Sequence, residues 1–72
     1  MREVIYEVRP VDGLWEVRIA GGDGQIELAL SSDAAIRRAR SLVQDGGGGR
    51  VLLLDEGGRV AREYIEGAAS SS

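Results

Sequence analysis

Residues 31–45, SSDAAIRRARSLVQD, are the one stretch whose apolar side chains recur at helical spacing, so the architecture depends on them. The apolar residues form a single stripe along the predicted helix, made up of Ala35, Ile36, Ala39, Leu42 and Val43. Ser31 or Ser32 can cap the first turn, and the glycines at 46–49 end the helix because glycine enters the left-handed C-cap conformation without a steric cost. The rest of the chain must pack against this stripe.

Alternation of polar and apolar residues predicts strands before the helix, at residues 3–10, 14–20 and 25–30, and two further strands are predicted after it, at 50–55 and 59–65. Asp12-Gly13 is the strongest hairpin signal between them. The order β-β-β-α-β-β predicts a single α+β domain in two layers, a five-stranded, mainly antiparallel sheet with one helix packed on one face. We expect the last hairpin to lie beside the first strand, because every pairing can then be antiparallel.

The same alternation assigns the side chains of the first three strands to the two faces of the sheet. The helix side is predicted to receive Val4, Tyr6, Val8, Trp15, Val17, Ile19, Ile26, Leu28 and Leu30. The outer face is predicted to receive Glu3, Ile5, Glu7, Arg9, Glu16, Arg18 and Glu27. Carboxylates outnumber arginines on this outer face, and phosphates would be repelled by it.

Length and composition limit the possible functions. The 72 residues allow one domain, predicted over 1–66, and residues 67–72 have no apolar period and are expected to form a disordered tail. The chain has no cysteine and no histidine, so we expect no disulfide, no metal site of the usual kind and no cofactor. No signal peptide or membrane-spanning run is recognisable, which predicts a cytoplasmic protein without a membrane partner.

Catalysis is not expected. The chain lacks lysine as well as histidine and cysteine, which leaves few general bases or nucleophiles. Twelve acidic residues make an accidental carboxylate pair common, and a small open sheet offers little of the apolar cleft that raises a catalytic pKa. The glycine runs at 21–24 and 46–49 lack the Walker pattern and are interpreted as turn and cap residues.

Several short motifs, taken in order, resemble the bacterial family called domain of unknown function 2188. They are YEVRP at 6–10, DG followed by WEV at 12–17, AIRRAR at 35–40, and an apolar run with a GRV turn at 51–60. The resemblance covers residues 6–64. It implies a fold but no catalytic or binding residues, since the family name itself records no activity.

The run Val51-Leu52-Leu53-Leu54 breaks the alternation expected of a strand with one solvated face. If Val51 and Leu53 face the helix, Leu52 and Leu54 lie on the open face. A patch of this kind tends to be buried against a partner, most simply a second copy in a two-fold homodimer. Another protein is the other candidate, including a peptide strand added to a sheet edge. The predicted association surface consists of Ile5, Leu52, Leu54 and Ala61.

The alternative hypothesis is a nucleic-acid-binding or regulatory accessory protein that uses the polar face of the helix. Arg37, Arg38 and Arg40 form a small basic patch there, diluted by Asp33 and Asp45. The net charge of −3 makes nucleic acid the less favoured partner, because general polyanion binders are usually basic.

Overall fold

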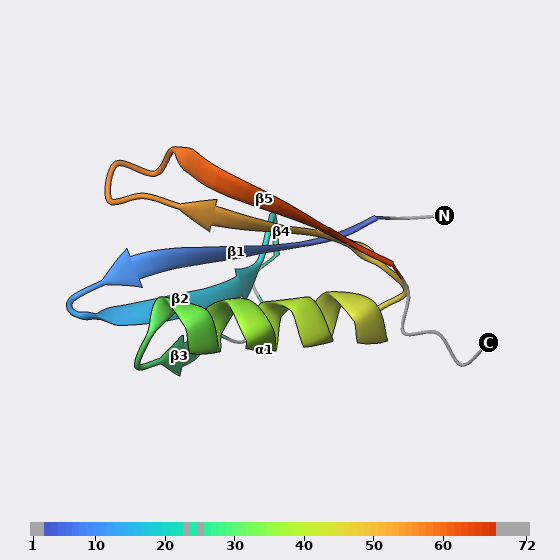
Figure 1. Cartoon of the computed structure of the whole chain (residues 1–72), viewed down its shortest axis with the longest axis horizontal. Coiled ribbons are helices and arrows are strands. Elements are labelled where there is room, and N and C mark those ends of the chain that lie inside the picture. The colour runs from blue at the N-terminus through green and yellow to red at the C-terminus, as the bar shows by residue number, and fades with distance from the viewer. Residues whose placement is uncertain (1–2, 23, 25, 68–72) are drawn as a thin grey trace.

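The computed structural model describes residues 3–22, 24 and 26–67. Along the chain these residues form β1 (Val4–Val11), β2 (Leu14–Ile19), β3 (Glu27–Ala29), α1 (Ser32–Asp45), β4 (Gly49–Leu54) and β5 (Val60–Glu66). The strands make one five-stranded sheet in the order β3-β2-β1-β4-β5, and α1 runs across one face of it (Figure 1). The predicted α+β architecture is confirmed. Apart from Gly67, the predicted tail lies outside the described residues.

The last hairpin lies beside β1, as expected, but its pairing with β1 was predicted wrongly. β4 runs parallel to β1, whereas the other three pairs of neighbouring strands are antiparallel. The reason is the helix, which carries the chain about 20 Å back along the sheet and so starts β4 in the same direction as β3 and β1. The chain therefore makes a crossover connection past two strands rather than a simple meander (Figure 1).

The ends of α1 follow from its serine and glycine residues. Oγ of Ser31 accepts a hydrogen bond of 3.1 Å from the backbone N–H of Ala34, which satisfies one of the free donors of the first turn. At the other end the N–H of Gly48 donates to the carbonyl of Val43, at 2.9 Å, and the N–H of Gly47 to that of Gln44. This is a Schellman cap, in which Gly47 supplies the positive φ of +105°.

The core lies between α1 and the central strands. Its fully buried side chains are Val8, Val17, Ala35, Ala39, Val43 and Val51. The two alanines bring the helix backbone close to the sheet because neither has a side chain beyond Cβ. Trp15 packs against this core, which confirms its predicted position on the helix side of β2.

The faces of β3 were predicted the wrong way round. Ala29 pairs with Trp15 and Glu27 pairs with Val17, which places both on the helix side, whereas Leu28 lies opposite Glu16 on the open face. A register one residue away from the expected one exchanges every side chain between the faces. Here the helix side of β3 carries the small side chain of Ala29 and the carboxylate of Glu27, which forms an ion pair with an arginine of α1. As a result three apolar side chains are exposed, Ile26 by 51%, Leu28 by 60% and Leu30 by 87%.

Candidate functional site

The open face of the sheet is covered by ion pairs between neighbouring strands. Arg9 Nε lies 3.0 Å from a carboxylate oxygen of Glu16, and Arg18 lies 3.7 Å from Glu7. These two pairs join β1 to β2 where the register sets the residues directly opposite each other. The predicted outward positions of these four residues are confirmed, whereas Glu27 lies on the other face.

Arg50 extends the charged network across the other half of the open face. Its two terminal nitrogens contact Glu63 at 2.7 Å and Glu3 at 2.9 Å, so one guanidinium joins β4 and β5 to the residue that precedes β1. The hydrogen bonds that Arg50 donates to these carboxylates, the one to Glu63 first, raise the pKa of Arg50 above its usual range. With Arg50 and Glu63 included, the ion pairs of this face join four carboxylates to three arginines, which leaves one negative charge in excess.

The predicted association surface is only partly accessible. Ile5 and Leu52 are half-buried on the open face, and the register places Leu52 between Glu7 and Glu63. Leu54 is only 9% exposed, so it offers little surface to a partner. Ala61 is exposed at the irregular point of the β4–β5 pairing. The four residues thus do not form one continuous exposed apolar patch.

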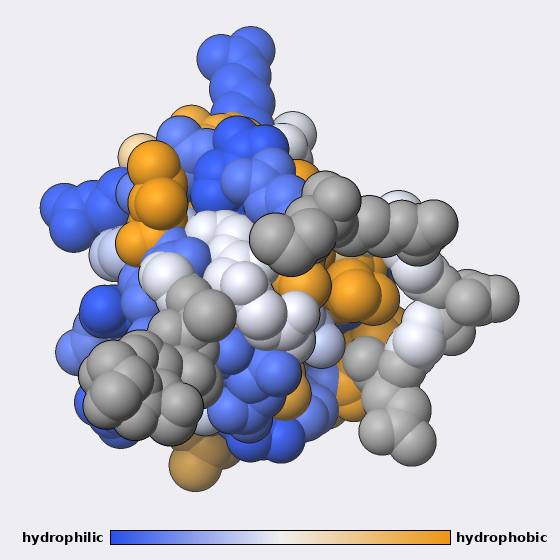
Figure 2. Space-filling model, turned by 90° about the vertical axis from the view of Figure 1, so that its right-hand side faces the viewer, coloured by the Kyte–Doolittle hydropathy of each residue, from blue (hydrophilic) through white to orange (hydrophobic). Residues whose placement is uncertain are grey.

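The most exposed apolar side chains lie instead on the two edge strands. β3 and its flanks present Ile26, Leu28 and Leu30, while β5 presents Val60, exposed by 55%, and Ile65, exposed by 79%. Figure 2 views the end of the molecule at which β1 begins and β5 ends, where the surface is largely hydrophilic and apolar atoms occur in separate groups. Sequence reasoning missed the β3 group because alternation assigned these residues to the core.

Two of the three helix arginines are already paired. Arg38 makes a bidentate contact with Glu27 of β3, at 2.8 and 3.1 Å. Arg40 contacts Glu66 of β5 at 2.7 Å, and its guanidinium lies 5.9 Å from the centre of the Tyr64 ring. Arg37 is exposed and has no ion pair within the described part of the chain. Arg38 and Arg40 therefore hold the edge strands to α1, and Arg37 alone of the three is left without an ion pair in the described residues.

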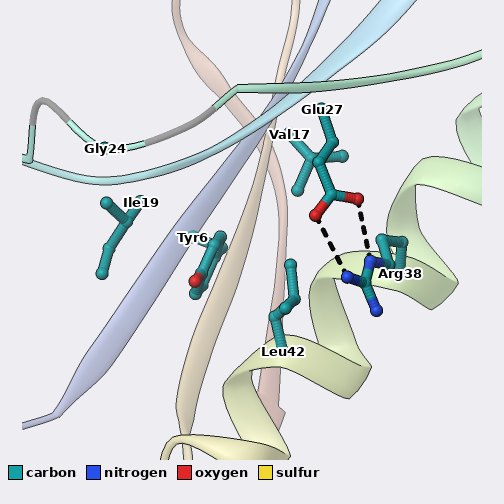
Figure 3. A pocket seen from close by; sticks show the side chains of 7 residues that line it. All are labelled: Tyr6, Val17, Ile19, Gly24, Glu27, Arg38 and Leu42. Carbon is teal, nitrogen blue, oxygen red and sulfur yellow. Dashed lines mark hydrogen bonds and ion pairs between the residues drawn. The ribbon is translucent and has the colours of Figure 1, made fainter.

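A hollow of about 340 Å³ lies between α1 and the β2 side of the sheet. Figure 3 shows its apolar walls, with Leu42 from the helix and Ile19 from β2, and the Glu27–Arg38 pair at its rim. Tyr6 brings a hydroxyl group to this space. The volume is at the lower end of the range for small-molecule sites. No local sequence signal marks the hollow, because its walls come from β1, β2, β3 and α1, which only the fold brings together.

The Glu27–Arg38 pair changes the acid–base behaviour of its two residues. The hydrogen bond that Glu27 accepts from Arg38 lowers the pKa of Glu27 below the usual range, and the same bond raises the pKa of Arg38. The carboxyl group of Glu27 therefore binds its proton less tightly in the folded chain than in the unfolded chain. As a result the pair favours folding above about pH 4.5, and this contribution to stability disappears as the pH falls further.

We expect Arg38→Ala to return the pKa of Glu27 to the usual range for a glutamate. NMR would measure this directly by following the chemical shift of the Glu27 carboxyl carbon from about pH 2 to about pH 7. Arg37→Ala removes the same charge from the adjacent helix position and should leave the titration of Glu27 unchanged. Equal effects of the two substitutions would show that overall charge, and not the bidentate contact, lowers the pKa.

The described residues contain no group of three or more acidic, histidine or cysteine side chains arranged to hold a metal ion. No helix in the described residues is long and apolar enough to cross a bilayer.

Comparison with known proteins gives one match. The family model described as an uncharacterized protein conserved in bacteria, DUF2188, matches residues 6–65. The chain belongs to this family. The DUF2188 match runs from Tyr6 in β1 to Ile65 in β5, so it includes α1, the three strands β2 to β4 and most of β1 and β5. No curated protein and no solved structure matches the chain.

Proposed function

We propose that this DUF2188 chain is a small non-catalytic binding and assembly module of the bacterial cytoplasm, which self-associates through the β3 edge and the open face beside it. The observation that carries the proposal is the exposure of Ile26, Leu28 and Leu30 around one edge strand. Apolar side chains gathered at one place on a small monomer usually mark an interaction surface. A sheet edge adds unpaired backbone donors and acceptors to that surface.

The two edges of the sheet differ in how well they resist pairing. β5 carries charged residues at Arg62 and Glu63, and its pairing with β4 shifts register between Leu53 and Leu54. Charges and irregular pairing are common means of protecting an edge from other strands. β3 has a single charged residue, Glu27, which Arg38 holds on the helix side. Its remaining protection is its short length, so β3 is the better candidate for association.

A non-catalytic role is supported by the chemistry of the charged residues. The chain contains no histidine, lysine or cysteine, and its glutamates at positions 3, 7, 16, 27, 63 and 66 each lie in an ion pair. A carboxylate whose oxygens are occupied by an arginine is poorly placed to accept a proton from a substrate.

Sedimentation velocity over a range of concentrations tests the proposal. We expect the average mass of the wild-type chain to rise with concentration, and Leu28→Lys to raise the dissociation constant by about tenfold or more, because a charge at an edge opposes strand pairing. Leu28 is well exposed, so the substitution should not affect folding. Ile65→Lys on the β5 edge is the matched control and should associate like the wild type. A wild-type chain that stays monomeric at every concentration would contradict the proposal.

Nucleic-acid or regulatory binding through the helix remains the second hypothesis, with less support. Of the three helix arginines, Arg37 alone is without an ion pair to the described residues, so a phosphate would have to compete with Glu27 for Arg38 and with Glu66 for Arg40. Fluorescence anisotropy with a labelled duplex, repeated with all three arginines replaced by alanine, would favour this hypothesis if salt-dependent binding were present and then lost.

A further inference from the structure

The free edge of β3 can be deduced from the hydrogen-bond pattern of the neighbouring strands. The N–H of Ala20 donates to the carbonyl of Ile5 at 2.8 Å, which fixes which residues of β2 direct their backbone groups toward β1. Antiparallel pairs alternate, so Trp15 and Val17 direct theirs toward β3.

Within β3 the same alternation decides which backbone groups are already used. Glu27 pairs with Val17 and Ala29 with Trp15, so these two residues bond to β2. Leu28, between them, directs its N–H and C=O away from β2 and toward the free edge. The residue with unused backbone groups is thus also one of those with an exposed apolar side chain.

The sequence around Leu28 is complementary to itself when read in the opposite direction. In Ile26-Glu27-Leu28-Ala29-Leu30, antiparallel pairing about Leu28 sets Ile26 opposite Leu30 of a second copy and Leu28 opposite Leu28. All three open-face pairs are then apolar. On the helix side Glu27 lies opposite Ala29, so no two like charges face each other. The charge of Glu27 is also balanced by Arg38 of its own chain.

The β5 edge lacks this property. Antiparallel pairing about its middle residue, Glu63, would bring two carboxylates directly opposite each other, an arrangement that destabilises a sheet. The same glutamate already forms the 2.7 Å contact with Arg50. Charge therefore favours self-pairing at β3 and opposes it at the middle of β5.

We infer that the occupant of the β3 edge is a second copy of this chain, paired antiparallel about a two-fold axis through Leu28. The two sheets then form one continuous ten-stranded sheet, with both helices on the same face. The inference rests on the proposed function and specifies its partner, strand and register. Leu28 of each copy both donates to and accepts from Leu28 of the other, since the two residues form a hydrogen-bonded pair.

Disulfide cross-linking tests the register, because the natural chain has no cysteine. A hydrogen-bonded antiparallel pair holds its Cα atoms about 5.5 Å apart, within the range that a disulfide spans. With oxidised glutathione as oxidant, Leu28→Cys should form covalent dimers about tenfold faster than Ile65→Cys, the matched variant on the other edge. Cross-linking of Ile65→Cys at an equal or higher rate would overturn the inference.

Amide hydrogen exchange of the unmodified chain provides a second measurement. Raising the concentration into the dimer range should increase the protection of the Leu28 amide by about tenfold or more, while Glu27 and Ala29, already bonded to β2, should change much less. If the wild type associates in sedimentation but Leu28 gains no protection, the β3 register is wrong and the assembly proposal survives. If the wild-type chain does not associate at all, both the β3 pairing and the proposed assembly function are wrong.

Discussion

Replacing Gly49 with alanine is expected to lower the free energy of unfolding by about 3 kcal/mol or more, a large part of the stability of a domain of this size. Gly49 begins β4 and pairs directly with Val4, whose carbonyl oxygen occupies the position that a Cβ atom would take. The backbones of β1 and β4 must then move apart at this point, and these two strands join the two halves of the sheet. Urea denaturation followed by circular dichroism would measure the loss.

Gly47→Ala is the matched control for this prediction. Gly47 also has a positive φ, of +105°, but a Cβ atom there would meet no atom within 4 Å. Its replacement should therefore cost only the strain of the backbone conformation, about 1 kcal/mol. An equal loss for the two variants would show that conformational strain, and not the overlap with Val4, makes Gly49 necessary.

The elements of this fold were predictable because their signals are local. The spacing of Ala35, Ala39 and Val43 defines a helical stripe wherever the helix lies, and Ser31 caps its first turn through a contact only three residues away. Asp12 and Gly13 form the expected two-residue turn, both with positive φ as a type I′ hairpin requires. Information of this kind is contained in a few neighbouring residues.

The errors arose where distant parts of the chain decide the outcome. The register of β3 depends on Glu27 finding Arg38 eleven residues later and on Ala29 lying beside Trp15, and alternation within the strand cannot report either contact. The direction of β4 relative to β1 depends likewise on where α1 returns the chain. In both cases a local pattern allowed two arrangements, and tertiary contacts favour one.

The candidate site illustrates the same limit. Of the two leucines predicted to lie on the open face, Leu54 is buried within the single chain, while Leu28, assigned to the core, is exposed. The single stretch with helical spacing correctly indicated that one helix covers only one face of the sheet. It could not indicate which apolar residues would remain on the surface, because that depends on the pairing of each strand with its neighbours.

Val51→Ala is expected to lower the free energy of unfolding by about 2–3 kcal/mol, because it removes two methyl groups from a fully buried position and leaves a cavity. Val51 lies between Tyr6 and Tyr64 on the helix side of the sheet. Val60→Ala makes the same chemical change on an exposed residue of β5 and should cost about 0.5 kcal/mol or less. Comparable losses in thermal or urea unfolding would mean that the β4 run is not buried beneath α1 in solution. The assignment of the helix side and the open face of the sheet would then be wrong.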